Sequence, residues 1–451
     1  IGNLRRGRAG RGFIAVRSNE RAAAALGVNV VRSKLLAFAL GSAVAGLGGV
    51  LLAFKSHIVI FGSYDMFASI SAVTFATIGG VGYLAGALLG AGLAAGGIGS
   101  WILNRYGGLD PWLGVIAGAS VLLMLMQNPD GLAGAASHGH ADPLTNRLVR
   151  SARRLRFGSV TGEAEVRSAP PLADVWRAPA DAVLSVDDLT VRFGGVTALA
   201  HLSLTVRPGE VVGLIGPNGA GKTTAIDAIT GFVRPTSGSV SLGTTNLDHS
   251  SVHRRAALGL TRSFQSVELF DEMTVLENLQ VASDRRDLTA YLSNLVDTRR
   301  PELPPIVDAA VATFGLEPVL TTNPPQLSYG SRRLVGLARA VATRPCVLLL
   351  DEPAAGLNRH ESRELADAIR NLASQCGIGI LLVEHDMSVV MAVCDRITVL
   401  DFGSTIADGT PAEIRHDPAV IAAYLGTPRQ DTDTSAVVSG APLGAQLGED
   451  R

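Results

Sequence analysis

Residues 216–224 have the sequence Gly-Pro-Asn-Gly-Ala-Gly-Lys-Thr-Thr, and this stretch decides the fold of the C-terminal half of the chain. It matches the pattern GxxxxGK[ST], a loop between a strand and a helix whose backbone N–H groups bind phosphate. The apolar run at 210–215 predicts the strand, and a helix is expected from Thr223 onward. With both elements in place, a glycine-rich turn that matches by chance is disfavoured. The stretch therefore predicts binding of a nucleoside triphosphate.

Lys222 is the chemically distinctive residue of this loop. Of the 39 basic residues in the chain only three are lysines, and Lys222 is the only lysine after Lys55. A compact ammonium on a flexible stem reaches between β- and γ-phosphates, where a planar guanidinium does not fit. Thr223 offers a hydroxyl to the Mg²⁺ that accompanies the nucleotide.

The composition divides the chain into two unlike parts. The 451 residues suffice for two or three domains, and a net charge of −1 says little about partners. The first 136 residues are rich in Gly, Ala, Leu and Val, whereas the remainder has the mixed composition of a soluble domain. Cys346, Cys376 and Cys394 have no metal-like spacing, so we expect buried thiols in a reducing cytosol.

The N-terminal part predicts transmembrane helices. Residues 1–33 carry seven arginines and one acid, an excess that marks the cytoplasmic side of a membrane. Residues 35–54 are uncharged and long enough to span a bilayer. The uncharged stretch 66–103 is too long for one span, and the glycines at 79–82 predict a turn that divides it. Residues 111–126 predict a last helix. Because both 1–33 and the nucleotide-binding domain belong on the cytoplasmic side, an even number of crossings is expected, and we predict four.

The segments around these helices have their own patterns. Gly86 and Gly90, and likewise Gly92 and Gly96, are four residues apart, which either allows close helix approach in a membrane or reflects ordinary packing of small residues. Residues 137–180 predict an Arg-rich linker whose arginines contact anionic lipid headgroups or are simply solvated, and both can hold. An α/β domain is expected over 181–427, and the Gly/Ala/Ser/Asp-rich residues 428–451 predict a disordered tail.

Ionisable side chains follow two apolar strands of the predicted α/β domain. Asp351 and Glu352 end the run 347–352, where Asp351 can hold Mg²⁺ and Glu352 can orient and deprotonate an attacking water. His385 ends the run 381–385, where an imidazole can hydrogen-bond a γ-phosphate and the water. The alternatives, an acidic turn and a structural histidine, are disfavoured by Lys222 in the same domain.

Two more motifs lie between these residues in the sequence. Gln265 ends Thr-Arg-Ser-Phe-Gln at 261–265 and could contact Mg²⁺ or water while linking two subdomains. The sequence Leu-Ser-Tyr-Gly-Ser at 327–331 begins a helix, and its small residues expose backbone N–H groups that favour an anion.

Along the chain these five motifs occur in the order phosphate-binding loop at 216–224, Gln265, LSYGS at 327–331, Asp351-Glu352 and His385, and in this order they resemble the motifs of the ATP-binding-cassette (ABC) ATPases. The resemblance implies a P-loop (RecA-like) α/β core with a helical subdomain at about 266–340, following an all-α transmembrane permease fragment at 1–136. It also implies that Glu352 is the catalytic base and His385 the switch histidine, with Gln265 in a catalytic role, and that two such domains pair head to tail. The implied ATP contacts are Phe193, which stacks on adenine, Gly216, Asn218, Gly219, Ala220, Gly221, Lys222, Thr223 and Thr224, with Ser328 and Gly330 facing the partner domain's nucleotide. The implied Mg²⁺ ligands are Thr223, Gln265 and Asp351.

The chain departs from the usual ABC motifs at two places, and at both its sequence resembles that of the ATPases of branched-chain amino acid importers. Residues 327–331 read LSYGS where many members have LSGGQ, and Asn358 replaces a frequent aspartate, which bears on coupling between the paired domains. Residues 17–38 also resemble the cytoplasmic loop and next helix of that importer's permeases, and 79–91 match as well. In that family the loop docks on the ATPase. The chain thus resembles the end of a permease fused to its ATPase, with earlier permease helices expected before residue 1.

The resemblance implies an ATPase that drives uptake of branched-chain amino acids across the cell (inner) membrane, with the ATPase domain in the cytoplasm. The implied partners are a second ABC ATPase domain, a second permease subunit, an extracytoplasmic substrate-binding protein and membrane lipid; no nucleic acid is expected. Urea, short amides or other amino acids are alternative substrates. A membrane-tethered, non-transporting ATPase is the alternative from another class, although intact Glu352 and His385 disfavour a mere nucleotide sensor. A soluble P-loop kinase is excluded by LSYGS and the membrane helices.

Overall fold

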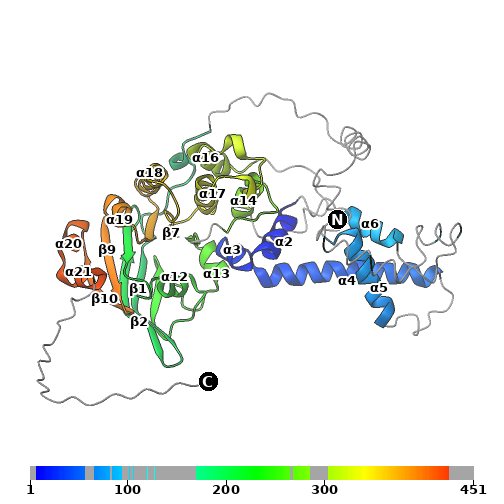
Figure 1. The fold of residues 1–451 in the computed structure, drawn as a ribbon, viewed down its shortest axis with the longest axis horizontal. Coiled ribbons are helices and arrows are strands. Elements are labelled where there is room, and N and C mark those ends of the chain that lie inside the picture. The colour runs from blue at the N-terminus through cyan, green and yellow to red at the C-terminus, as the bar shows by residue number, and fades with distance from the viewer. Residues whose placement is uncertain are drawn as a thin grey trace, which may run out of the picture. The chain divides into compact units, whose positions relative to one another are not determined.

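The chain forms two compact units, whose elements are labelled in Figure 1. The computed structural model describes residues 7–55, 66–81, 84–93, 169–264, 268–284 and 303–425, with four isolated positions between 101 and 126. The first unit contains residues 1–17, 29–170 and 284–302, and the second contains 18–28, 171–283 and 303–451. Residues 18–28 of the predicted permease loop therefore belong to the same unit as the glycine-rich loop at 216–224, which we call the phosphate loop. We call this segment the docked loop.

The first unit is helical. Its elements are α2 (Arg8–Ser18), α4 (Val30–Lys55), α5 (Met66–Gly79) and α6 (Leu84–Leu93). Within Val30–Phe54 of α4, an 18-residue window has a mean hydropathy of 2.2, and among the described residues this is the one helix long and apolar enough to cross a membrane. At about 1.5 Å per residue, α5 and α6 are shorter than a bilayer core of about 30 Å. The predicted helix at 111–126 lies outside the described residues, apart from two isolated positions.

The predicted turn between two apolar helices is confirmed, since α5 ends at Gly79 and α6 begins at Leu84. The two helices pack with their backbones in close approach. A Cβ added at Gly86 or Gly90 would lie within 3 Å of backbone atoms of Gly79, Gly80 or Phe75. For Gly86 and Gly90 this contact favours close helix approach. A Cβ at Gly92 would meet nothing within 4 Å, and Gly96 lies outside the described residues.

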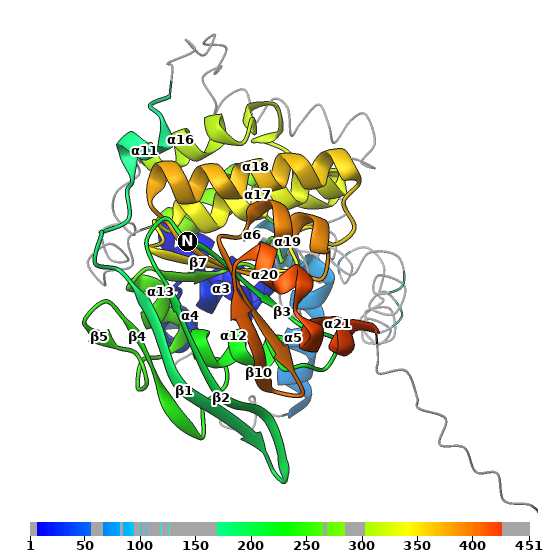
Figure 2. The same ribbon diagram turned by 90° about the vertical axis from the view of Figure 1, so that its left-hand side faces the viewer.

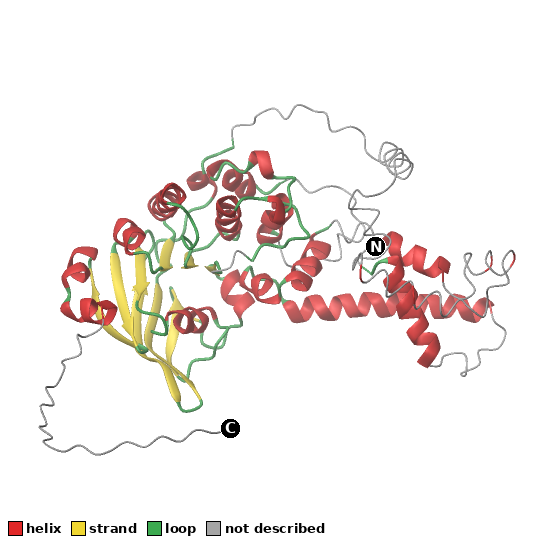
Figure 3. Cartoon of the chain, viewed as in Figure 1, coloured by secondary structure: helices red, strands yellow, loops and turns green. Residues whose placement is uncertain are grey.

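The second unit is built on a six-stranded sheet with the order β10-β9-β3-β8-β7-β6 (Figure 3). Its strands from β9 to β6 are parallel, and β10 is antiparallel to β9. The three central strands are buried on both faces, as their continuous apolar sequences predict. The strand bounds are β3 (Val211–Ile215), β6 (Leu260–Arg262), β7 (Val347–Asp351), β8 (Gly379–Val383), β9 (Arg396–Asp401) and β10 (Ser404–Gly409).

A four-stranded antiparallel sheet, with the order β2-β1-β4-β5, completes the core. Apolar residues of both sheets and of α12 form one continuous buried cluster, so α12 is fixed between them (Figure 2). This packing holds the helix that follows the phosphate loop rigidly in place. The bounds are β1 (Leu184–Phe193), β2 (Val196–Val206), α12 (Lys222–Thr230), β4 (Ser237–Leu242) and β5 (Thr245–Asn246).

The predicted helical subdomain is present in the described residues around 268–340. Here α14 (Val275–Ser283), α16 (Pro305–Thr313) and α17 (Tyr329–Ala342) pack on one another. Asn278 is fully buried. Its side chain accepts a hydrogen bond from Phe270 N (2.9 Å) and donates one to Phe270 O (3.1 Å), so both backbone polar groups of Phe270, which precedes α14, have a partner. The remaining elements are α3 (Glu20–Ala25), α11 (Leu172–Val175), α13 (Val252–Ala257), η3 (Glu317–Val319), η4 (Pro324–Gln326), α18 (Arg359–Cys376), α19 (Met387–Val393), α20 (Pro411–His416) and α21 (Pro418–Leu425).

Candidate nucleotide site

The candidate site lies where three neighbouring parallel strands end. The phosphate loop follows β3, His385 follows β8, and Glu352 follows β7. The carboxyl ends of parallel strands meet at one edge of a sheet, which is where open α/β sheets bind ligands. An open cleft of about 470 Å³ lies there. It is lined by Val196, Thr197, Ala198, Asn218, Gly219, Ala220, Gly221, Lys222, Thr223, Thr224, Glu352 and Phe402.

The phosphate loop has the geometry of an anion cradle. Gly219 has φ +85° and Gly221 has φ +100°, so the loop curls in a way that other residues rarely allow. A Cβ at Gly219 would meet nothing within 4 Å, so the space in front of the loop is open. Lys222 begins α12, and its Nζ donates to Gly216 O (2.7 Å) and Pro217 O (2.9 Å). Burial lowers the pKa of Lys222, while Glu352 and Asp351 act to raise it.

The two carboxylates after β7 have different environments. Asp351 is buried, and its Oδ2 accepts a hydrogen bond from Arg262 Nη2 at 2.8 Å. Burial raises the pKa of Asp351, opposed by Arg262. Glu352 lines the cleft and has φ +47°, a left-handed conformation that costs about 1–3 kcal/mol in a non-glycine residue and is typical of functional sites. The hydroxyl of Thr223 and these carboxylates are the hard oxygen donors that suit Mg²⁺.

His385 lies beside Glu352 and is positioned by a buried acid. Its Nδ1 is 3.9 Å from Glu352 Oε2 and 3.8 Å from Glu384 Oε2. Glu384 is fully buried and accepts hydrogen bonds from Ala354 N (2.6 Å) and His385 N (3.1 Å). Burial raises the pKa of Glu384. Glu384 therefore fixes the backbone after both β7 and β8, a role that its place in an apolar run could have suggested.

Several predicted residues lie away from this cleft. Phe193 is exposed at the end of β1 and is not among the lining residues, whereas Phe402, which was not predicted, lines the cleft from the β9–β10 turn. The only sequence signal for Phe402 is an exposed aromatic beside a glycine. Ser328 and Gly330 begin α17, and a Cβ at Gly330 would meet Glu361 at 2.5 Å. Gln265 lies outside the described residues.

The two departures from the usual motifs lie close together in space. The hydroxyl of Tyr329 accepts a hydrogen bond from Arg333 (2.7 Å), and its ring lies about 3.0 Å from where a Cβ on Gly356 would be. Asn358 caps α18 by accepting from His360 N and Glu361 N, and Glu361 accepts from Asn358 N in return. Asparagine and aspartate are equally good at this capping position, so the cap is retained.

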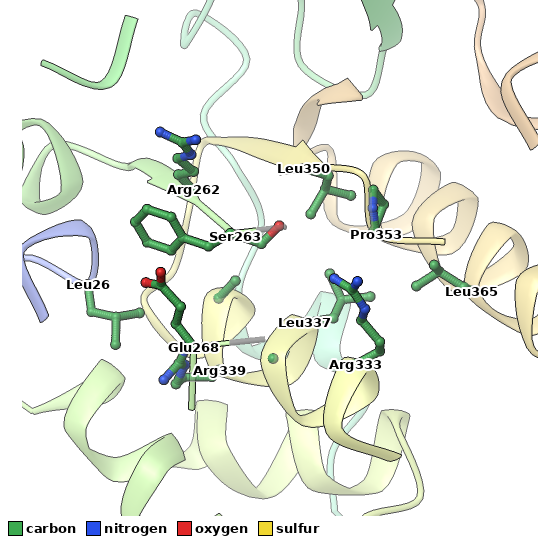
Figure 4. Close-up of a pocket in the computed structure, with 13 residues that line it drawn as sticks. Leu26, Arg262, Ser263, Glu268, Arg333, Leu337, Arg339, Leu350, Pro353 and Leu365 are labelled. Carbon is green, nitrogen blue, oxygen red and sulfur yellow. The ribbon is translucent and has the colours of Figure 1, made fainter. Parts of the chain in front are cut away.

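The docked loop borders a second cavity, of about 30 Å³ (Figure 4). Leu26 lines it next to Glu268, with Arg333 and Leu365 on the opposite side. Among the described residues, four buried side-chain atoms lack a hydrogen-bond partner, and all four belong to residues that line this cavity: Arg262 Nε, Glu268 Oε2, Arg333 Nε and Arg339 Nε. A polar cavity of this size can hold ordered water.

Comparison with known proteins agrees with this geometry. Residues 199–355 match the family model "ABC transporter", residues 3–125 match "Branched-chain amino acid transport system / permease component", and residues 404–429 match "Branched-chain amino acid ATP-binding cassette transporter". The high-affinity branched-chain amino acid transport ATP-binding protein LivG of Salmonella typhimurium is 44% identical over 249 residues, covering 54% of this chain and 98% of LivG. BraF of Pseudomonas aeruginosa, with the same description, is 43% identical and 98% covered. A nucleotide-free ATP-binding cassette from an ABC transporter aligns at 28% identity with a TM-score of 0.48, covering 55% of this chain and all of that one.

The parallel sheet with its phosphate loop defines a P-loop fold. The match to the ABC transporter family and to LivG shows that this domain is an ATPase whose hydrolysis of ATP is coupled to transport. The chain belongs to the family of branched-chain amino acid ABC transporters and carries a permease component ahead of its ATP-binding component. The fold and family expected from the sequence are thereby confirmed.

Proposed function

We propose that the cleft at the ends of β3, β8 and β7 binds ATP with Mg²⁺. The N–H groups of the phosphate loop and the Lys222 ammonium hold the phosphates, and Thr223, Gln265 and Asp351 supply the oxygen ligands for the metal. When bound, Mg²⁺ would neutralise part of the negative charge of the phosphates. Glu352 orients and deprotonates the attacking water, and His385, beside it, donates to the γ-phosphate. Gly216, Asn218, Gly219, Ala220, Gly221 and Thr224 complete the phosphate cradle. Phe193, which is exposed at the end of β1 outside the lining of the cleft, stacks on the adenine.

The transported substrates are branched-chain amino acids. This proposal rests on the family models matched by both ends of the chain and on the relatives LivG and BraF, whose names specify that transport. Urea, short amides and other amino acids remain the alternatives for the substrate.

The proposal that ATP hydrolysis is coupled to transport is supported by the packing of the docked loop within the ATPase unit. Its helix α3 is capped by Asn19, packs against α13, and buries Ala22 and Ala23 completely. Leu26 reaches the cavity formed by residues on both sides of Gln265. A permease segment that is part of the ATPase unit must move with it, so closure of the cassette is transmitted to the permease.

The assembled transporter contains further subunits. Ser328 and Gly330 do not line the cleft of their own chain, which supports their facing the nucleotide of a second ABC ATPase domain. A second permease subunit and an extracytoplasmic substrate-binding protein complete the complex. The chain is a multi-pass protein of the cell (inner) membrane, with residues 181–427 in the cytoplasm as the ABC ATP-binding domain. A permease fragment at 1–136 and an Arg-rich linker at 137–180 precede that domain, and membrane lipid is a further partner.

The test uses the complex reconstituted in vesicles with its binding protein. Glu352→Gln should lower ATP hydrolysis by about 10²–10⁴-fold, the usual contribution of a general base. Glu364→Gln is the matched control, because Glu364 is an exposed residue of α18. Undiminished turnover in Glu352→Gln would reject the catalytic role. Uptake of labelled leucine, isoleucine and valine should require ATP, and no uptake of any of the three would reject the substrate assignment while leaving the ATPase intact.

A further inference from the structure

A chain of four alternating charges joins the docked loop to the carboxylate of Asp351. Arg21 Nη2 lies 3.5 Å from Asp227 Oδ1, and the same oxygen is paired with Arg262 Nη1. Arg262 Nη2 in turn donates to Asp351 Oδ2 at 2.8 Å. The order along the chain of charges is therefore Arg21, Asp227, Arg262, Asp351, with no net charge.

Arg262 is the rigid member of this chain. Its side chain is 4% exposed, and its guanidinium lies 4.8 Å from the ring centre of Phe264 and 5.9 Å from that of Phe232. The two rings meet edge to face at 5.9 Å. A planar guanidinium beside two aromatic rings, with each terminal nitrogen on a different carboxylate, has one favourable orientation.

Asp227 connects the docked loop to the phosphate loop. It lies on α12, the helix that begins at Lys222, and its side chain is largely buried. Arg21 approaches it from α3 with an exposed side chain whose guanidinium lies 4.9 Å from the ring centre of Phe232. A displacement of α3 thus changes the charge next to Asp227 and, through it, the pairing of Arg262.

We propose that Arg262 is a positioning residue for the Asp351 carboxylate, and that Arg21 of the permease segment adjusts that position through Asp227. We call the four residues Arg21, Asp227, Arg262 and Asp351 the relay. It transmits a displacement of the docked loop to the carboxylate of Asp351, and it does not pass through Gln265. It rests on the proposed role of Asp351 in hydrolysis of ATP with Mg²⁺. Arg262→Gln leaves Asp227 and Asp351 buried without their shared cation, and loss of a residue that orients a metal ligand typically lowers metal affinity or activity about 10–100-fold.

The experiment measures ATP hydrolysis by the reconstituted complex at saturating ATP over a range of Mg²⁺ concentrations. Arg262→Gln should lower kcat and raise the half-saturating Mg²⁺ concentration, each by about tenfold or more. Binding of a fluorescent ATP analogue in EDTA should change by less than about twofold, because the phosphate loop is intact. Arg262→Lys keeps the charge and should restore part of the Mg²⁺ response. A purely structural role for Arg262 predicts equal losses in both assays and no rescue by lysine.

Arg21→Ala tests the outer half of the relay, the pair of Arg21 and Asp227. The Arg21 side chain is 59% exposed, so this variant should fold even where the Arg262 variants do not. It should raise the half-saturating Mg²⁺ concentration roughly 1.5- to 5-fold, the range of an exposed ion pair. This effect should vanish in the Arg262→Gln background, because the two residues act through one another. Arg254→Ala, at an exposed arginine of α13, is the matched control and should behave as wild type.

An unchanged Mg²⁺ response in Arg21→Ala, or effects of Arg21→Ala and Arg262→Gln that simply multiply, would overturn the relay. Hydrolysis that depends on Glu352 but on neither arginine overturns the relay alone and leaves the proposed site intact. A wild-type complex without Mg²⁺-dependent hydrolysis overturns the proposed site itself.

Discussion

Replacing Gly221 by alanine tests how tightly the phosphate loop is held against the antiparallel sheet. Gly221 has φ +100°, and a Cβ there would lie 2.6 Å from Ala198 O, well inside the 3.4 Å at which ordinary contact begins. Gly219 has φ +85° but open space around its Cβ position, so Gly219→Ala is a control with the same backbone penalty and no clash. The two variants therefore separate strain from steric overlap.

The expected magnitudes follow from these two terms. A left-handed conformation costs about 1–2 kcal/mol in alanine, and both variants incur this cost. Overpacking against the fixed backbone of β2 adds about 1–3 kcal/mol in Gly221→Ala alone. For a domain of this size that difference corresponds to a melting temperature about 2–12 °C lower than that of Gly219→Ala.

The assay is calorimetric unfolding of the full chain in detergent without nucleotide, so that phosphate contacts do not contribute. Gly221→Ala should melt below Gly219→Ala, and Gly219→Ala below wild type. Equal melting temperatures for the two variants would refute the reasoning, because they would show that the loop can move away from Ala198 at no cost.

Three further predictions concern other parts of the chain. Gly90→Leu should reduce the recovery of monodisperse complex in size-exclusion chromatography several-fold, because α5 occupies the space, whereas Gly92→Leu, with nothing within 4 Å, should not. Burial raises the pKa of Cys394 to about 12, so on the order of one thiol in ten thousand is ionised at pH 8, and maleimide labelling of Cys394 should be slow until the chain unfolds; rapid labelling of Cys394 in the folded protein at pH 8 would contradict this. Asn358→Ala should destabilise the second unit by about 1 kcal/mol in thermal unfolding, and Asn358→Asp should restore it; an alanine variant as stable as wild type would show that the cap contributes nothing.

The parts of the fold that depend on local sequence could be predicted. The apolar runs at 210–215 and 347–352 are strands β3 and β7, because a continuous apolar run suits a strand buried on both faces. The phosphate loop and the turn after Gly79 were equally local signals. Helix length in the first unit was less predictable, since the uncharged stretch 66–103 shows where charge is absent but not where α5 and α6 begin and end.

Contacts between residues distant in sequence could not be predicted. Arg21, Asp227 and Arg262 have no common motif, and only the packing of α3, α12 and β6 in one unit brings them together. The place of Phe402 in the cleft could not be predicted either, because it depends on which strand β9 pairs with. Glu384 lies beside His385 in a predicted motif, but the sequence does not show that its carboxylate accepts hydrogen bonds from the backbone after both β7 and β8.

The unequal use of lysine and arginine has a physical explanation in this structure. Arg262 binds two carboxylates at once, on Asp227 and on Asp351, because a guanidinium presents separate nitrogens in a fixed plane. An ammonium is a point charge and cannot fix the direction between two partners in that way. Lys222 has the opposite role in the proposed site. Its Nζ donates to two carbonyl oxygens of its own loop, and binding of ATP as proposed requires it to leave them for phosphate oxygens, which a flexible stem allows. A chain that uses arginine almost everywhere can therefore retain lysine at this position, where the cation has to change partners.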